Sequence, residues 1–339
     1  MVNPILRNII IGKLQREFVI PLSGKPVVDG PGGNLLYAAS GLAIWDNQGG
    51  GLVSKVGEEY PRDWIELARK TGFDTRGIKI LPESIDLRFF CAFQEDDNPS
   101  LDSPISHFAR LDIPFPHALL GYTPPVAKLD SRTTPDVLTI RPQDIPDDYF
   151  DASAVHLCPI DYLTHALLPG ALRQGNITTI TIDPSENYMS PSFWDDVPSV
   201  VKGITAFLTS ETKLRSLFKG RSADPWEMAE AIAGYGCEIV VIKRRSKGQW
   251  VYEHASRKRW TIPAYIARVV NPLGAGDAFC GGFLYGYTNT YDAVEATLHG
   301  NISASLSIEG TGPFYALDSL PGLAQARLDS LRDLVAKAP

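Results

Sequence analysis

Residues 271–282 read Asn-Pro-Leu-Gly-Ala-Gly-Asp-Ala-Phe-Cys-Gly-Gly, which places a glycine-rich turn at the start of an apolar helix. Residues 264–270 before the turn are apolar and β-branched, and apolar residues recur at helical spacing after it, so the segment predicts a strand, a tight turn and a helix. The first turn of a helix has unpartnered N–H groups and a positive dipole end, which favour an anion. Because Gly274, Ala275 and Gly276 have little side-chain bulk, their N–H groups can converge on a phosphate oxygen.

Asp277 follows this turn directly. A carboxylate beside an anion pocket can accept the proton of an attacking alcohol while the N–H groups stabilise charge on a transferring phosphoryl group. Glycine and aspartate also begin helices for purely local reasons. The motif alone therefore leaves both a catalytic base and a plain helix start open.

The rest of the chain alternates strand-like and helix-like segments, which predicts a mostly parallel sheet with helices on both faces. A second glycine-rich turn within residues 30–45 opens another helix, whereas residues 95–146 are rich in Pro, Asp, Ser and Thr and predict a lid or insertion. Strands are expected at residues 8–12, 51–56, 87–94, 154–157, 178–182, 205–208, 239–242, 249–252 and 259–265, and helices at 35–45, 62–71, 162–172, 211–218, 225–235 and 323–337.

Composition excludes several classes of protein. A net charge of −7 and an isoelectric point near 5.4, without a basic stripe, argue against a nucleic-acid partner. No run of about 18 apolar residues and no secretion signal is visible, so we expect neither membrane insertion nor export. The four cysteines are scattered and the six histidines lack metal-ligand spacing, which favours a reduced, cytoplasmic setting without zinc.

Together the two glycine-rich turns make the chain resemble the ribokinase-like (PfkB-type) carbohydrate kinase family, whose members carry an N-terminal Gly-Gly motif for the substrate and a C-terminal Gly-Ala-Gly-Asp motif for phosphoryl transfer. The resemblance covers residues 8–317. It implies an α/β three-layer sandwich in which residues 1–339 form a single kinase domain, with a small β-rich lid built near residues 13–30 and 85–146. It also implies ATP-dependent, Mg²⁺-assisted phosphorylation of a hydroxyl on a sugar or sugar-containing molecule such as a nucleoside, with Asp277 as general base. A lid with exposed strand edges can pair with the lid of a second copy of the chain and so form a homodimer.

For the acceptor substrate, the resemblance assigns residues from the first third of the chain. Glu17 stands where members bind a sugar hydroxyl, and Tyr37 replaces a common hydroxyl-binding Asn, so the acceptor contacts differ from those for ribose. Arg88 would approach the site from the lid. The ordinary alternatives are an exposed Glu17, a core-packed Tyr37, a solvated Arg88 and a plain helix-start turn. The substrate-binding candidates are Glu17, Gly32, Gly33, Asn34, Tyr37 and Arg88.

For the nucleotide, the chain departs from the family pattern. Members commonly carry Asn-x-x-Glu, which acts on the Mg²⁺ shell, where this chain has Ser210-Glu211-Thr212-Lys213. Glu211 can supply the carboxylate and Lys213 a point charge, or Ser210 can simply cap a helix. Further on, Arg245 replaces an expected glycine in a basic loop that is either solvated or faces phosphates. The nucleotide-side candidates are Ser210, Lys243, Arg245, Gly248, Asn301 and Gly312, with Glu211 for Mg²⁺ and Asn271, where Asp is usual, for a monovalent cation.

Two rival functions remain at this point. The altered positions Ser210, Lys213 and Arg245 are consistent with a pseudokinase that binds a nucleoside or sugar without phosphate transfer. Glycine-rich strand-turn-helix units also bind dinucleotides in oxidoreductases. Neither turn, however, follows the first strand as Gly-x-Gly-x-x-Gly with an acidic residue about 20 positions later.

Overall fold

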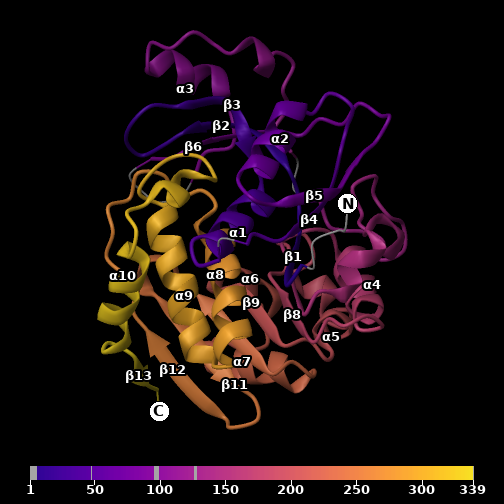
Figure 1. Cartoon of the computed structure of the whole chain (residues 1–339), viewed down its shortest axis with the longest axis vertical. Helices are drawn as coiled ribbons and strands as arrows, with labels where there is room; N and C mark the ends of the chain where they lie inside the picture. The colour runs from indigo at the N-terminus through magenta and orange to yellow at the C-terminus, as the bar shows by residue number, and fades with distance from the viewer. Residues whose placement is uncertain (1–5, 47, 95–98, 126–127, 339) are drawn as a thin grey trace.

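The computed structural model describes residues 6–46, 48–94, 99–125 and 128–338, and a large sheet runs through it (Figure 1). Its ten strands lie in the order β13-β12-β11-β10-β9-β8-β7-β1-β4-β5. The seven strands from β10 to β5 pair in parallel, whereas the remaining three add antiparallel partners at one edge. The strands are β1 Asn8–Ile11, β4 Gly51–Val56, β5 Asp74–Ile80, β7 Ala154–Leu157, β8 Thr179–Ile182, β9 Ala206–Ser210, β10 Ile239–Lys243, β11 Gln249–Glu253, β12 Lys258–Ile262 and β13 Ala336–Lys337.

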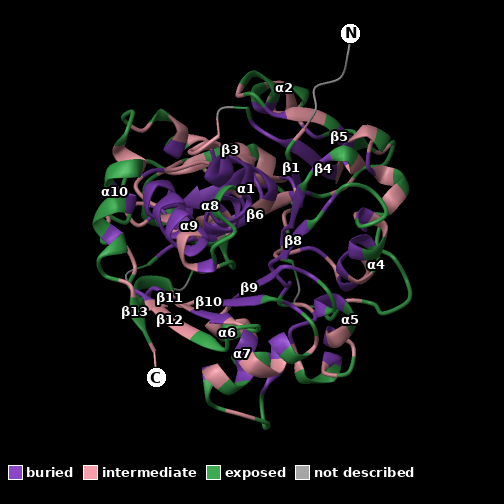
Figure 2. Cartoon of the chain, turned by 60° about the horizontal axis from the view of Figure 1, so that its bottom comes forward, coloured by how far each residue is buried: buried purple, intermediate pink, exposed green. Residues whose placement is uncertain are grey.

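Helices cover both faces of this sheet because each parallel connection must cross over it. One apolar core joins α4 to α7 with the sheet, and two others join α1, α2, α8, α9 and α10 with its opposite face. Figure 2 shows α8 and α9 mostly buried, while α10 presents an exposed side. The helices are α1 Asn34–Ala43, α2 Arg62–Lys70, α4 Tyr162–Leu172, α5 Val197–Val201, α6 Glu211–Leu217, α7 Pro225–Gly234, α8 Ala275–Thr290, α9 Ala293–Ser307 and α10 Leu323–Arg332.

A second, three-stranded sheet lies largely within the segments expected to form a lid, residues 13–30 and 85–146, of which residues 95–98 and 126–127 lie outside the described part of the chain. Its order is β3-β2-β6, with β2 at Gln15–Ile20, β3 at Val27–Gly32 and β6 at Arg88–Ala92. The helix α3, Pro104–Arg110, lies against β6 on the outer side (Figure 1). The apolar residues Phe18, Ile20, Phe90, Ala92, Phe108 and Leu119 pack between the sheet and this helix. The α/β architecture with a small β-rich lid is therefore confirmed.

Two predicted elements are wrong. Residues 264–270 form no strand, because the Tyr265 N–H is donated to the side chain of Asn301 and the Val270 N–H to the carbonyl of Ile308. The predicted helix at residues 323–337 ends at Arg332, and Ala336–Lys337 pairs with β12 instead. The open edge of β12 offers backbone hydrogen-bond partners to Ala336–Lys337, and these residues could not use them if the helix continued.

Glycines allow α1 and α8 to cross with their backbones in contact. A β carbon on Gly41 would lie 2.0 Å from the carbonyl oxygen of Ala278, and one on Gly281 would lie 1.8 Å from that of Ala38. Only glycine tolerates such an approach. The two helices that begin at the glycine-rich turns are thereby held together. None of the described helices is long and apolar enough to cross a membrane.

Candidate active site

The two glycine-rich turns meet in the structure. Gly274, the residue before α8, lies against the ring of Tyr37 on α1. Among the described residues, the N–H groups of Gly274 and Gly276 have no hydrogen-bond acceptor, whereas Ala275 donates its N–H to the Pro272 carbonyl at 3.3 Å. The start of α8 therefore presents two unpartnered N–H groups, the arrangement that favours an anion.

Asp277 lies in the first turn of α8 and is half-buried. Burial raises the pKa of its carboxyl group to about 6, and the negative charge of Asp183 adds to the rise. The ammonium groups of Lys243 and Lys213 oppose it. A carboxylate with a pKa just below neutrality is ionised at physiological pH and still basic enough to accept a proton.

Sequence reasoning missed Asp183, which joins two lysines at the same edge of the sheet. Asp183 directly follows β8, and its carboxylate accepts hydrogen bonds from Lys213 Nζ at 2.8 Å and Lys243 Nζ at 2.5 Å. Burial alone would raise the pKa of Asp183, but the two ammonium groups outweigh it and lower that pKa to about 2. Its position at the carboxyl end of a predicted strand was the signal that could have identified it.

Lys243 also connects this cluster to the first turn of α8. Its ammonium group donates to the Gly276 carbonyl at 3.1 Å and lies 3.3 Å from Cys280 Sγ. Burial would lower the pKa of Lys243, but the charge of Asp183 outweighs burial and raises it. The lysine stays charged beside the start of α8.

Glu17 lies on the lid strand β2 and contacts the N-terminal glycine-rich turn. It is 2% exposed and accepts hydrogen bonds from the Gly33 N–H and the Tyr37 hydroxyl, both at 2.8 Å. Burial raises its pKa to about 7, although these two donors lower it. A β carbon on Gly32 would lie 1.9 Å from Glu17 Cδ, so this contact requires glycine. The structure thus brings Glu17, Gly32, Gly33 and Tyr37 together.

Asn34 and Arg88 are engaged in contacts within the protein. The Asn34 amide accepts from the Lys13 N–H and donates to the Pro159 carbonyl, both at 2.7 Å. Arg88 pairs with Asp86 and donates to the carbonyls of Ala118 and Leu120, so it ties β6 to the outer part of the lid. Substrate binding by either residue stays a prediction.

The nucleotide-side residues follow the ends of β9 and β10. Ser210 caps α6 by accepting the Lys213 N–H at 3.2 Å, which confirms its capping role. Glu211 pairs with Arg215 and Arg244. Arg245 has φ of 53°, the left-handed conformation that glycine adopts most easily, which accounts for the glycine expected there.

The loops near the carboxyl ends of β9 and β10 are fixed by contacts of Asn301, Gly248 and Asn271. The buried Asn301 amide donates to Gln249 Oε1 and the Pro263 carbonyl and accepts the Tyr265 N–H, so it fixes the segment after β12. A β carbon on Gly248 would lie 2.0 Å from the Ile262 carbonyl. Asn271 is buried and accepts the Leu273 N–H, and Gly312 has φ of 85° with open space around it. Their ligand contacts stay predictions.

The acidic side chains of the site limit how Mg²⁺ could bind. Among the described residues, no three His, Cys, Asp or Glu side chains gather as metal ligands. Asp183 and Glu211 are each paired with two basic side chains. Mg²⁺ commonly binds through one or two carboxylates together with substrate phosphates and water. The residues therefore fit an ion carried by nucleotide phosphates, and Glu211 stays the predicted acidic ligand.

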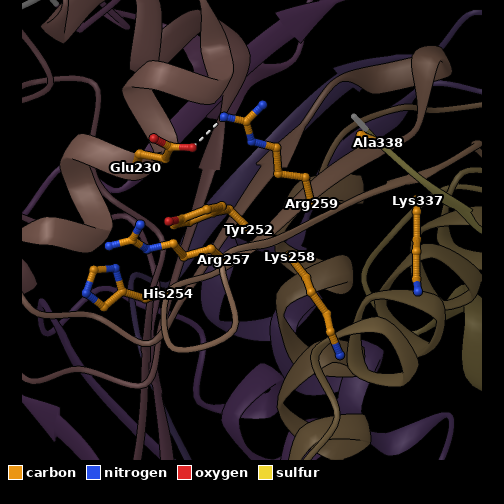
Figure 3. Close-up of a pocket in the computed structure, with 8 residues that line it drawn as sticks. All are labelled: Glu230, Tyr252, His254, Arg257, Lys258, Arg259, Lys337 and Ala338. Atoms are coloured by element: carbon orange, nitrogen blue, oxygen red, sulfur yellow. Dashed lines mark hydrogen bonds and ion pairs between the residues drawn. The ribbon is translucent and has the colours of Figure 1, made fainter.

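Another pocket lies at the turn between β11 and β12 (Figure 3). It has a volume of about 640 Å³ and carries the Glu230–Arg259 ion pair. Because β11 runs antiparallel to β10, with Glu253 opposite Ile239, this turn is at the sheet edge opposite Lys243. The pocket is therefore separate from the candidate active site.

Comparisons with known proteins identify the family. Residues 150–319 match the sequence pattern of the pfkB family carbohydrate kinase. A cytidine kinase of Thermococcus kodakarensis is 28% identical over 286 residues, which are 83% of this chain and 88% of the relative. An uncharacterized sugar kinase of Archaeoglobus fulgidus is 34% identical over 143 residues, which are 42% of this chain and 54% of the relative.

Solved structures share the fold across nearly the whole chain. A putative ribokinase II from E. coli, solved in complex with ATP and Mg²⁺, has a TM-score of 0.68 at 16% identity and is matched over 96% of this chain and 99% of that one. A Burkholderia thailandensis nucleoside kinase in complex with inosine has a TM-score of 0.66 at 16% identity, over 96% of this chain and 98% of that one. The chain belongs to the pfkB family of carbohydrate kinases and is a PfkB-type carbohydrate or nucleoside kinase with the ribokinase-like fold.

Proposed function

We propose that this protein transfers the γ-phosphoryl group of ATP to a hydroxyl of a nucleoside, with Asp277 as the general base. The observation that carries the proposal is the position of Asp277. It is half-buried, has a pKa of about 6, and follows a helix start with two N–H groups that have no acceptor in the described part of the chain. The nucleoside acceptor is supported by the cytidine kinase, which is similar over most of both chains.

In this proposal, Asp277 accepts the proton of the acceptor hydroxyl as its oxygen attacks phosphorus. The N–H groups of Gly274 and Gly276 donate to the oxygens of the transferring group, where negative charge must be stabilised. Mg²⁺, when bound, would supply further neutralisation of the nucleotide phosphates, with Glu211 as the acidic residue that would hold it. The lid sheet would exclude water, whose attack would otherwise hydrolyse ATP.

Glu17 is a positioning residue in this scheme. It fixes the Gly33 N–H and the Tyr37 hydroxyl, and Tyr37 in turn packs on Gly274. The lid strand β2 is thereby connected to the turn that receives the phosphoryl group. Positioning of this kind matters because a displacement of about 1 Å can cost a hundredfold in rate.

The test is ADP release measured with ATP, Mg²⁺ and a panel of nucleosides and sugars. We expect turnover with at least one nucleoside and its loss in Asp277→Asn, with nucleotide affinity kept. Turnover with sugars alone would reject the nucleoside acceptor, and an Asp277→Asn variant of near-normal rate would reject the base. Binding of nucleosides without turnover of any acceptor would instead support a pseudokinase.

We also propose a homodimer that forms through the lid. β3 is an edge strand of the small sheet, and its Val28 is 49% exposed. Exposed edge strands pair readily with a second chain. Light scattering should give twice the mass of the 37.1 kDa chain, and Val28→Lys should shift the protein towards monomer. A monomer at micromolar concentration would reject this assembly.

A further inference from the structure

Two lysines share one buried carboxylate beside the catalytic turn. β8, β9 and β10 are adjacent parallel strands, so the residues at their carboxyl ends lie along one edge of the sheet. Asp183 follows β8, Lys243 ends β10, and Lys213 lies in the first turn of α6, directly after β9. The side chain of Asp183 is 3% exposed, and those of Lys213 and Lys243 are 11% and 12% exposed.

The two lysines face two carboxylates. Each carboxylate oxygen of Asp183 accepts from one ammonium group, and Asp277 is a second negative charge that acts on both lysines. The cluster is therefore close to neutral, so what it offers an anionic ligand is the N–H donors that remain without an acceptor. The phosphates of a nucleotide bound at the start of α8 are such a ligand.

The two lysines differ in the donors that they retain. Lys243 donates to Asp183 and to the Gly276 carbonyl and contacts Cys280 Sγ, which occupies its three N–H groups. In the described part of the chain, the only hydrogen bond of the Lys213 ammonium group is to Asp183. Since a lysine has three N–H donors, Lys213 retains two of them for a ligand.

From these contacts we propose that Lys213, oriented by Asp183, binds the nucleotide phosphates directly, so that ATP binding needs little divalent cation. Lys243 is the positioning residue that connects the cluster to the catalytic turn. In the family motif that the sequence resembles, Lys213 stands where the acid of Asn-x-x-Glu is expected, which implies a reversed local charge at this position. The inference rests on the proposed function, because it takes ATP as the ligand.

The test is calorimetric ATP binding without an acceptor, in Mg²⁺ and in EDTA. We expect the wild type to lose no more than about tenfold in affinity when Mg²⁺ is removed. Lys213→Met should weaken metal-free binding by about tenfold or more, the usual cost of losing hydrogen bonds to a charged group. Lys213→Arg should retain metal-free ATP binding. Lys219→Met is the matched control, because Lys219 is an exposed lysine after the same helix, and it should bind ATP as the wild type does.

A measurement on the wild type needs no substitution and so does not depend on variant folding. ATP in EDTA should slow the acetylation of Lys213, followed by mass spectrometry, and leave that of Lys219 unchanged. Equal metal-free affinity of wild type and Lys213→Met, or an absolute Mg²⁺ requirement in the wild type, would overturn the inference. If ATP binds as expected but no acceptor is phosphorylated, the kinase proposal fails while the Lys213 contact stands.

Discussion

The ring of Tyr37 occupies the space that a side chain on Gly274 would need. A β carbon built on Gly274 would lie 2.1 Å from Tyr37 Cγ, and Gly274 has φ of 75°. The start of α8 therefore depends on glycine for two separate reasons, the left-handed backbone and the contact with α1. This contact joins the two glycine-rich turns that lie far apart in the sequence.

Gly274→Ala should lower the free energy of unfolding by about 2 to 5 kcal/mol and abolish turnover. The left-handed conformation costs about 1 to 2 kcal/mol for a residue with a β carbon, and displacement of Tyr37 adds about 1 to 3 kcal/mol. Gly322, before α10, is a matched control because its φ is 81° and no atom lies within 4 Å of an added β carbon. In chemical denaturation, Gly322→Ala should lose only the free energy that the left-handed backbone costs. Equal losses of unfolding free energy in both variants would contradict a contribution from the contact between Gly274 and Tyr37.

The pH dependence of kcat/KM should show the ionisation of Asp277. Its pKa is raised to about 6, and the base must be deprotonated to accept a proton. We therefore expect kcat/KM to fall about tenfold per pH unit below pH 6 and to level off above it, when measured with saturating ATP. A profile that stays flat down to pH 5 would exclude a base with this pKa.

Asp277→Asn should be more stable than the wild type at neutral pH although it is inactive. Because the folded-state pKa of about 6 lies above the ordinary value of 3.8, the folded protein binds the proton more tightly than the unfolded chain does. The ionised carboxylate therefore destabilises the fold, and this cost grows from pH 4 to pH 6 and is complete above it. The gain in unfolding free energy should reach about 1 to 3 kcal/mol at pH 8 and vanish near pH 4. A variant less stable at pH 8 would contradict this sign.

Tyr37→Phe should destabilise the protein mainly above pH 7. The Tyr37 hydroxyl donates to Glu17, whose pKa is about 7, so its loss leaves an ionised, buried carboxylate oxygen without a donor. The expected cost is about 1 to 3 kcal/mol where Glu17 is charged, and it should shrink below pH 6, where Glu17 binds a proton. Thermal unfolding of both proteins across this range measures the difference, and a loss independent of pH would point to packing instead.

The parts of the fold that sequence reasoning predicted are those set by local pattern. The buried strands and the glycine turns depend on apolar spacing and turn residues, which each segment carries by itself. Residues 264–270 have strand composition, but the side chain of Asn301 takes the Tyr265 N–H, and no local pattern reveals a partner 36 residues away. The pairing of Asp183 with Lys213 and Lys243 likewise requires three strand ends to be placed side by side. From the sequence, Lys213 could be assigned only by its place in a motif. The structure adds the side chain that orients it, because its ammonium group donates to Asp183.

Gly281→Ala should disrupt the site from a distance by separating α1 from α8. A β carbon at Gly281 would meet the Ala38 carbonyl at 1.8 Å, and backbone atoms cannot move aside as a flexible side chain can. We expect a loss of about 3 kcal/mol or more in unfolding free energy and reduced turnover, because Tyr37 lies on α1 and Gly274 directly precedes α8. Gly170 in α4 is the matched control, since an added β carbon there meets no atom within 4 Å. Gly170→Ala should stabilise the protein by about 0.5 to 1 kcal/mol, the usual effect in a helix. If Gly281→Ala folds and turns over like wild type, close backbone contact between α1 and α8 does not hold the two glycine-rich turns together.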